Sequence, residues 1–210
     1  FFVFNFDLSA EEFNITAKEI LIDKENEILV GKGSVTADDS EGRVIKADKI
    51  TYEKLREFLL AEGRVKITDI EGNILTTERA TYDKINNIII TYDNTELILK
   101  EGYKLVTKNV LYDTRKKILS SNDNSILTDN DGNYIETEMF QYHIKSNLFS
   151  SVGKIKIIDI KKNKYFFKEL HVDTKKKEMI GSDVSVILDQ ENFGVSEESN
   201  PRIVANDILI

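Results

Sequence analysis

A ten-residue pattern that returns every 30 residues is the feature that most restricts how this chain can fold. Its copies share alternating apolar residues and lie at residues 14–23, 44–53, 74–83, 104–113, 134–143 and 164–173. Two series of identical residues also recur every 30 positions without a gap. One is Tyr52, Tyr82, Tyr112 and Tyr142, and the other is Gly42, Gly72, Gly102 and Gly132. Such a period indicates one supersecondary unit stacked about six times, in which no copy buries its apolar face alone.

The composition favours strands in one elongated domain. The 210 residues are 40% hydrophobic and 31% charged, and include a single proline. These fractions are typical of a folded globular chain, and abundant β-branched and aromatic residues favour strands. We expect an N-terminal extension or first strand at 1–13 and the repeat domain at 14–189. Residues 190–210 should form a loop and the start of a further strand, leading to a C-terminal region beyond residue 210.

Within each repeat the apolar alternation slips once, which predicts a bend. Ile45 and Ala47 share one face, and the apolar residues then become Ile50 and Tyr52. An extra residue in a strand lets the chain bend while one side stays inward. We therefore predict a bulge or corner at positions 48, 78, 108, 138 and 168, flanked by small residues in the second limb. With polar turns between the limbs and glycine-containing turns between the repeats, each repeat should be two bent antiparallel strands.

Charge and cysteine usage exclude several function classes. A net charge of −8 argues against nucleic acid as a partner, because that affinity needs many basic residues on phosphates. The exception is residues 154–177, where nine lysines meet three acidic residues. This run fits either a solvated strand face or a patch for anionic head groups. The absence of cysteine excludes disulfides and thiol nucleophiles.

Candidate catalytic and metal-binding groups are few, so we expect no enzyme activity, cofactor or metal. His143 occupies a polar column beside a turn, and no nucleophile shares its face. Residues 129–132, Asp-Asn-Asp-Gly, together with Glu138 match part of a calcium-loop pattern, but Leu127 stands at the first ligand position. Because Gly132 is also one of the periodic turn glycines, a hairpin turn explains this segment.

The inward-facing residues are the remaining candidates for function. They form either a plain core or an open apolar groove able to hold acyl chains, since apolar concave surfaces are common ligand sites. The predicted lining consists of Ile50, Tyr52, Leu59, Val65, Ile67, Tyr82, Ile89, Leu97, Val110, Tyr112, Leu119, Phe140, Tyr142, Phe149, Ile155, Phe167 and Leu170.

The repeat resembles the OstA-like domain of the lipopolysaccharide-transport family (LptA, LptC and the N-terminal domain of LptD). The resemblance is carried by residues 45–48, Ile-Lys-Ala-Asp, by Tyr52-Glu53 and by Gly63-Arg64-Val65, echoed at Tyr82-Asp83 and Tyr112-Asp113. It covers roughly residues 14–189, and its motifs are individually degenerate but repeat without gaps.

This resemblance implies an all-β jelly roll of V-shaped section in the periplasm, with lipid binding in an apolar interior that conducts the acyl chains of lipopolysaccharide (lipid A) during outer-membrane assembly. An LptA-like bridge domain would be a partner through edge-strand pairing. The periplasmic domain of LptD is the most similar member, because residues 200–202, Asn-Pro-Arg, resemble the junction after its repeats. An outer-membrane barrel and its plug lipoprotein would then be further partners. Two departures are the missing cysteines, which some LptD proteins use for disulfides, and the missing barrel.

Three alternatives stay open. A free periplasmic LptA-like bridge protein would share the same repeats. A structural parallel β-helix of adhesin type would stack the tyrosines of successive coils as direct neighbours. A carbohydrate-binding sandwich is disfavoured because the chain has no tryptophan. The Phe-rich residues 1–6 fit either the end of a secretion signal or a first strand.

Overall fold

The computed structural model describes residues 13–189 and 202–209. Within these residues the chain forms one 17-stranded sheet and a single 3-10 turn, Lys54–Arg56. No helix in the described ranges is long and apolar enough to cross a membrane. The strands are β1 (Asn14–Thr16), β2 (Glu19–Asp23), β3 (Ile28–Asp38), β4 (Val44–Glu53), β5 (Phe58–Thr68), β6 (Ile74–Asp83), β7 (Ile88–Ile98), β8 (Lys104–Lys108), β9 (Leu111–Asp113), β10 (Ile118–Ser121), β11 (Ser125–Thr128), β12 (Tyr134–Thr137), β13 (Phe140–His143), β14 (Leu148–Ile158), β15 (Lys164–Asp173), β16 (Glu178–Ile187) and β17 (Arg202–Leu209).

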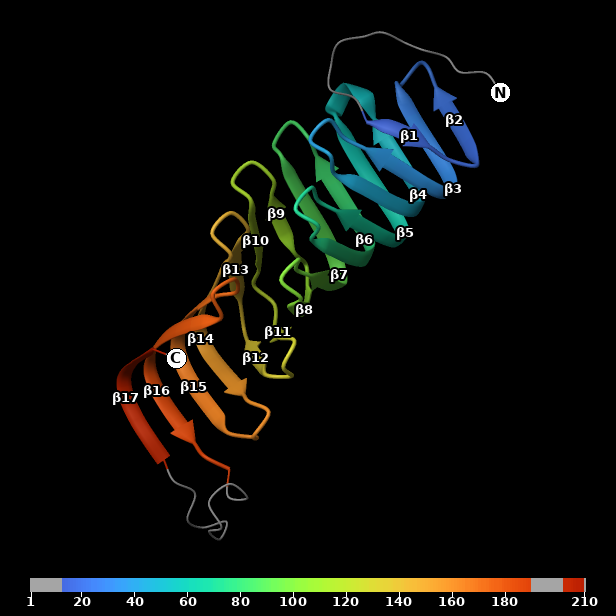
Figure 1. Cartoon of the computed structure of the whole chain (residues 1–210). Coiled ribbons are helices and arrows are strands. Elements are labelled where there is room, and N and C mark those ends of the chain that lie inside the picture. The colour runs from blue at the N-terminus through green and yellow to red at the C-terminus, as the bar shows by residue number, and fades with distance from the viewer. Residues whose placement is uncertain (1–12, 190–201, 210) are drawn as a thin grey trace.

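Successive strands pair antiparallel with their neighbours along the chain, so the sheet is a long up-and-down meander (Figure 1). In the middle of the stack each limb is split into two short strands, such as β8 with β9 and β12 with β13. All pairings between the described strands are antiparallel, and β5 lies between Tyr52 and Tyr82. The all-β fold of bent antiparallel strands is therefore confirmed, and the parallel β-helix alternative is wrong.

Each long strand bends at the predicted corner, but the extra residue lies in the neighbouring strand. Residues 63 and 64 of β5 stand opposite the single residue 78 of β6. The same two-against-one arrangement places residues 33 and 34 opposite position 48. Positions 108 and 138 adjoin the breaks that split the middle limbs.

The extra residue of the bulged strand does not disturb the apolar alternation of that strand, so the sequence pattern gives no sign of it. From Ala61 to Val65 the bulged strand takes four steps, whereas from Thr77 to Ala80 its partner takes three. Because four is an even number, the inward-facing residues of β5 stay in alternation through the bulge. Because three is odd, the alternation in β6 shifts by one residue, which is the slip seen in the sequence. Assigning the extra residue to the strand that slips was therefore wrong, although the corners themselves are confirmed. Gly63 has a φ of 77° in the bulge, which suits a residue without Cβ.

The bends divide the sheet into two walls that face each other across the core. The first wall presents a row of directly paired aliphatic side chains, and the second presents a row in which tyrosines alternate with leucine, isoleucine or phenylalanine. The first row contains Ile45, Ile67, Leu75, Leu97, Leu105, Leu127, Ile135 and Ile157. The second contains Tyr52, Leu59, Tyr82, Ile89, Tyr112, Leu119, Tyr142 and Phe149.

Small hydroxyl residues occupy the inner side of the corners. Thr107 Oγ1 and Ser125 Oγ are 2.8 Å apart, and Thr91 Oγ1 and Thr95 Oγ1 are 2.7 Å apart. Thr137 and Ser151 make the same kind of contact. All six side chains are buried. Their small volume lets the walls converge at the bend, and the paired hydroxyls satisfy each other.

Two series of turns form the free margins of the walls, which we call the lips. Lip A consists of the turns at 39–43, 69–73, 99–103, 129–133 and 159–163, and lip B of the turns at 54–57, 84–87, 114–117, 144–147 and 174–177. The positive-φ residues of lip B fall at the last position of each turn, as at Glu57 (45°) and Asn87 (59°). Together the walls and lips enclose an elongated interior with its mouth between the lips.

Candidate functional site

All 17 residues predicted to face inward are buried in one apolar cluster. Each is at most 7% exposed, and they come from both walls over most of the length of the stack. In the middle of the stack the walls meet closely, because the space beside Leu75, Ile89 and Tyr112 is only about 20 Å³. The predicted groove residues are thus brought together, but as a packed core in this part of the molecule. Their contact with acyl chains stays a prediction.

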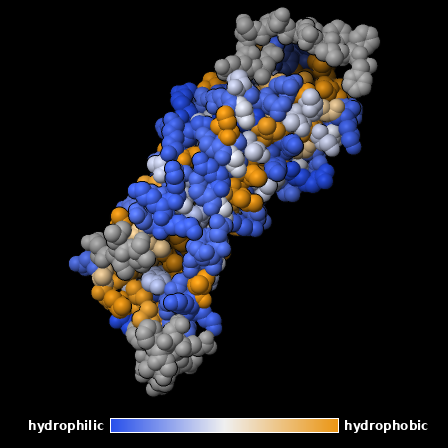
Figure 2. All heavy atoms as spheres, viewed as in Figure 1, coloured by the Kyte–Doolittle hydropathy of each residue, from blue (hydrophilic) through white to orange (hydrophobic). Residues whose placement is uncertain are grey.

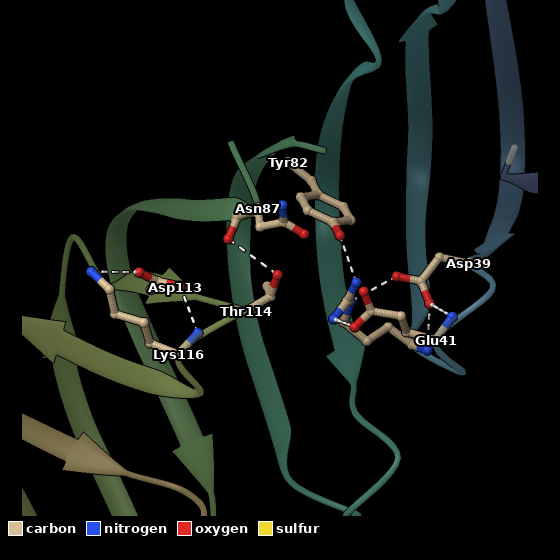
Figure 3. A network of polar contacts seen from close by, with 8 residues as sticks. Asp39, Glu41, Tyr82, Asn87, Asp113, Thr114 and Lys116 are labelled. Atoms are coloured by element: carbon tan, nitrogen blue, oxygen red, sulfur yellow. Dashed lines mark hydrogen bonds and ion pairs between the residues drawn. The ribbon is translucent and has the colours of Figure 1, made fainter. Parts of the chain in front are cut away.

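A polar network joins the two walls across the mouth near the N-terminal end. Arg43 of lip A is 2% exposed, its Nε lies 2.6 Å from Asp39 Oδ2, and its Nη1 donates to Glu41 Oε2 at 2.8 Å. Its Nη2 donates to the hydroxyl of Tyr82 at 2.5 Å, and its guanidinium lies 5.1 Å from the centre of that ring. Figure 3 shows Tyr82 reaching from its strand toward Asp39 and Glu41. The repeat gives no signal for this contact, since Arg43 stands where three other copies carry asparagine and one carries tyrosine.

Burial also perturbs the tyrosines of the second wall. Desolvation raises the pKa of Tyr82 and of Tyr112, and it raises the pKa of Tyr142 to about 12. The Tyr142 hydroxyl lies 3.4 Å from Thr174 Oγ1. The Tyr112 hydroxyl is buried without a hydrogen-bond partner among the described residues. At neutral pH the row is therefore uncharged, and its hydroxyl groups lie toward the mouth side of an otherwise apolar wall.

Phe13 is an interior residue outside the predicted lining. It is 7% exposed, and its ring packs edge-on against Tyr52 and Tyr82, with centroids 5.3 Å and 5.6 Å away. The ammonium of Lys84 lies 5.6 Å from the Phe13 ring. Phe13 precedes the first repeat, so periodicity offered no signal for it. At this end the interior is filled by the chain itself.

Toward the C-terminal end the interior holds a cavity of about 300 Å³. Its apolar lining comes from both walls and includes Leu127, Ile135, Ile157, Val172 and Met179. In Figure 2 apolar side chains gather on the lower part of the visible face, whereas polar ones cover its middle. A volume of 300 Å³ lies at the lower end of the range for small-molecule sites.

An ion pair between the lips spans this cavity. Lys177 Nζ of lip B lies 3.6 Å from Asp131 Oδ2 of lip A, and the two side chains are 62% and 64% exposed. Exposed pairs of this kind contribute about 0 to 1 kcal/mol. The mouth is therefore weakly closed here.

A ladder of side-chain hydrogen bonds stiffens lip A, which sequence reasoning missed. Asn133 Nδ2 donates to Asp129 Oδ2 at 2.7 Å, and Asn133 Oδ1 accepts the backbone N–H of Ile160 at 3.0 Å. Asn73 and Asn163 repeat this arrangement and accept from Lys100 and Asp189. The signal was present as an aspartate four residues before each of these asparagines.

The outer face carries a larger, open hollow of about 740 Å³ over β8, β11, β12, β14 and β15. Its surface includes Val106, Ile126 and Phe166, with Lys156 paired to Glu136 at 3.2 Å. This hollow lies on the outside of the first wall, apart from the interior.

The described residues contain no group of three or more His, Cys, Asp or Glu side chains placed to hold a metal ion. The turn at 129–132 is a hairpin turn of lip A, as expected, since Gly132 N donates to Asp129 O. His171 contacts Ser150 Oγ at 2.9 Å and Glu169 at 3.1 Å on a partly exposed strand surface.

No family model matches the chain. No curated protein matches it either. One solved structure that matches is LptH of Pseudomonas aeruginosa, described as the LptA homologous periplasmic component of the lipopolysaccharide transport device. The two share 11% identity over 93% of this chain and 96% of the other, with a TM-score of 0.28. A score this low establishes neither family nor function.

Proposed function

We propose that this chain carries lipopolysaccharide, with the acyl chains between the two walls and the sugars and phosphates outside the lips. The observation that carries the proposal is the apolar cluster that runs along the stack between the two walls, with a cavity whose lining reaches both lips near the C-terminal end. An amphiphile can place its chains in such an interior while its head stays in water. No covalent step is required.

Because the middle of the interior is packed, transport requires the walls to separate. Acyl chains would replace the contacts that the walls now make with each other, so apolar area stays buried in both states. The wall-to-wall bonds are few compared with the ladder of strand pairing, which would remain intact. The bent sheet can therefore open at its mouth without unfolding.

The resemblance of the repeat to the OstA-like domain supports the same proposal, and with it a periplasmic location. The finer assignment, to the N-terminal domain of LptD attached to the outer membrane, is proposed from residues 200–202, which lie mostly outside the described residues. A free bridge protein is the alternative. Fractionation of the source cells distinguishes these two assignments. An LptD domain should be recovered with the outer membrane, whereas a free bridge protein should be released with the periplasm.

Photocrosslinking to lipopolysaccharide tests the conduit. A photoreactive residue is placed in turn at Tyr82, Tyr112 and Phe140, which are buried, and at Asp83 and Lys108 as controls outside the core. We expect adducts from the three inward sites only. Equal reaction at inward and control sites, or no reaction from a folded protein, would overturn the proposal.

A further inference from the structure

One turn in each lip carries an apolar residue where the equivalent position of the other copies is polar. Leu99 of lip A stands where the other four turns carry aspartate, at positions 39, 69, 129 and 159. Ile144 of lip B stands where the other copies carry lysine or threonine. Leu99 is 1% exposed and Ile144 is 5% exposed, and both belong to the apolar cluster of the interior. Both lips therefore bury an apolar side chain here.

Leucine at position 99 gives up the capping that aspartate provides in the other turns of lip A. Asp69 accepts the backbone N–H and the side-chain amide of Asn73. The other aspartates at this position also accept a backbone N–H of their own turn. A leucine accepts no hydrogen bond, and Tyr103, which is also buried, stands in place of the asparagine. This turn has apolar burial in place of capping.

The stacking of the turns places Ile144 opposite this turn of lip A. The ion pair of Asp131 with Lys177 shows which turns face each other near the C-terminal end. Because the turns of each lip follow one another at one repeat per step, moving back by one repeat in both lips leads to the turns 99–103 and 144–147. These two turns therefore face each other across the mouth.

Electrostatics support this placement of the two turns. Glu101 belongs to the turn 99–103, and Tyr142 lies two residues before the turn 144–147. Burial is the main reason that the pKa of Tyr142 is raised, and the negative charge of Glu101 raises it further. Because such an effect weakens with distance, the two side chains lie in the same part of the mouth.

Leu99, Tyr103 and Ile144, which we call the latch, lie between two spaces of the interior. Ile144 borders the space of about 20 Å³ beside Leu75. Tyr103 borders the C-terminal cavity of about 300 Å³. An acyl chain that moves from the cavity into the packed part of the interior must therefore displace the latch.

Resting on the proposed function, we propose that the latch is the gate of the conduit, which separates the C-terminal cavity from the rest of the interior and gives way to acyl chains. A chain that parts the lips here replaces the contacts of Leu99 and Ile144 with its own, so apolar area stays buried. A sugar or phosphate cannot replace them, because a polar group buried without hydrogen bonds is unfavourable. The gate therefore passes the chains of an amphiphile and keeps its head outside the lips.

Two introduced cysteines test whether the latch turns face each other. A short bifunctional thiol reagent that contains a disulfide should join L99C/I144C within one molecule, because the chain has no other cysteine. The control L99C/I85C places the second thiol at an exposed residue two turns away in lip B, and we expect no linkage within the molecule. Failure of folded L99C/I144C to link would overturn the placement.

Dodecyl maltoside with a photoreactive diazirine at the end of its chain tests the gate, because its head is uncharged and does not respond to the charges of the lips. Mass spectrometry maps the adducts, which we expect at Met179 of the cavity in the wild type. The variants L99D/Y103N and I144T carry the residue types of the other copies. In both, adducts at Ile89, beside the small middle space, should rise about fivefold or more.

Matched controls make the same kinds of change outside the latch. I70D in lip A and I85T in lip B alter apolar residues that are 70% and 58% exposed, and we expect no change in the adducts. Far-UV circular dichroism confirms that each variant is folded, which L99D/Y103N favours because it restores the turn cap. Adducts at Ile89 that do not rise in the latch variants, an equal rise in the controls, or no adducts at Met179 would overturn the gate.

Linked L99C/I144C separates this proposal from the proposed function. With a photoreactive residue at Tyr112 or at Met179, lipopolysaccharide should react at both positions before linkage, and linkage should abolish reaction at Tyr112 until the reagent is cleaved. If reaction at Tyr112 persists after linkage, the gate is wrong and the conduit stands. If lipopolysaccharide reacts at neither position before linkage while dodecyl maltoside behaves as expected, the latch gates an interior for other amphiphiles and the conduit is wrong.

Discussion

At the scale of single residues, the repeat hides large differences between equivalent positions. Tyr82 and Tyr112 occupy the same column of the second wall, one repeat apart. The hydroxyl of Tyr82 accepts from the buried Arg43, while that of Tyr112 has no partner among the described residues. Periodicity predicted that both rings face inward, but it could not distinguish their polar ends, because the partner comes from the opposite lip.

The variants Y82F and Y112F should therefore differ in stability. Y82F removes an acceptor from a buried charged donor and should cost about 2 kcal/mol. Y112F removes an unsatisfied buried hydroxyl and should be neutral or stabilising by up to about 1 kcal/mol. Urea unfolding of both variants checks this pair. A loss in Y112F as large as in Y82F would contradict the assigned hydrogen bonding.

Tyr142 should make stability fall at alkaline pH. Its pKa in the folded protein is about 12, above the ordinary value of 10. A raised pKa means that its contribution is complete below pH 10 and is lost as pH rises toward 12, by about 2 to 3 kcal/mol. The difference in unfolding free energy between wild type and Y142F, measured from pH 9 to 12, should change accordingly. A difference that stays constant from pH 9 to 12 would contradict this cause.

At the scale of elements, the strands follow from alternation and the turns from side-chain capping. The bulged strands and their partners form a matched set, since two residues of one stand opposite one residue of the other. Sequence alone located the corners but placed the extra residue in the wrong strand, because a bulge preserves parity in the strand that contains it. Register between strands was needed to assign it.

The asparagine ladder of lip A should be a distinct source of rigidity. N133A removes the bond to Asp129 and the acceptor of the Ile160 N–H, which should cost about 1 to 2 kcal/mol. Hydrogen exchange of the Ile160 amide should become faster. N130A is the matched control, because the side chain of Asn130 donates to the backbone oxygen of Glu101 in the neighbouring turn, a bond that involves neither Asp129 nor Ile160. Unchanged exchange at Ile160 would show that the ladder contributes nothing.

At the scale of the whole molecule, the stack ends in strands that are paired on one side only among the described strands. β2 pairs with β3, and β17 pairs with β16. Leu21 and Val204 on these end strands are 48% and 80% exposed. Unpaired edges template further strands, and a second copy or an LptA-like domain would extend the interior in register.

End-to-end association can be trapped directly because the chain has no cysteine. We expect a mixture of L21C and V204C proteins to form disulfide-linked heterodimers under mild oxidation. The control V152C places an equally exposed thiol in the middle of the stack and should crosslink slowly. Equal crosslinking of V152C would mean that the ends have no preference for each other.

The sequence by itself determined the strand content, the 30-residue step, the position of the corners and the inward face of the repeats from residue 44 onward. These features are local, because alternation and turn residues act over a few positions, and six copies reinforce one another. The tertiary structure decided how far apart the walls stand, since that depends on side chains that meet from different repeats. Arg43 reaches Tyr82 across 39 positions and Lys177 reaches Asp131 across 46. Contacts between opposite lips do not recur with the 30-residue period. The closed N-terminal half and the cavity in the C-terminal half therefore follow only from the tertiary structure.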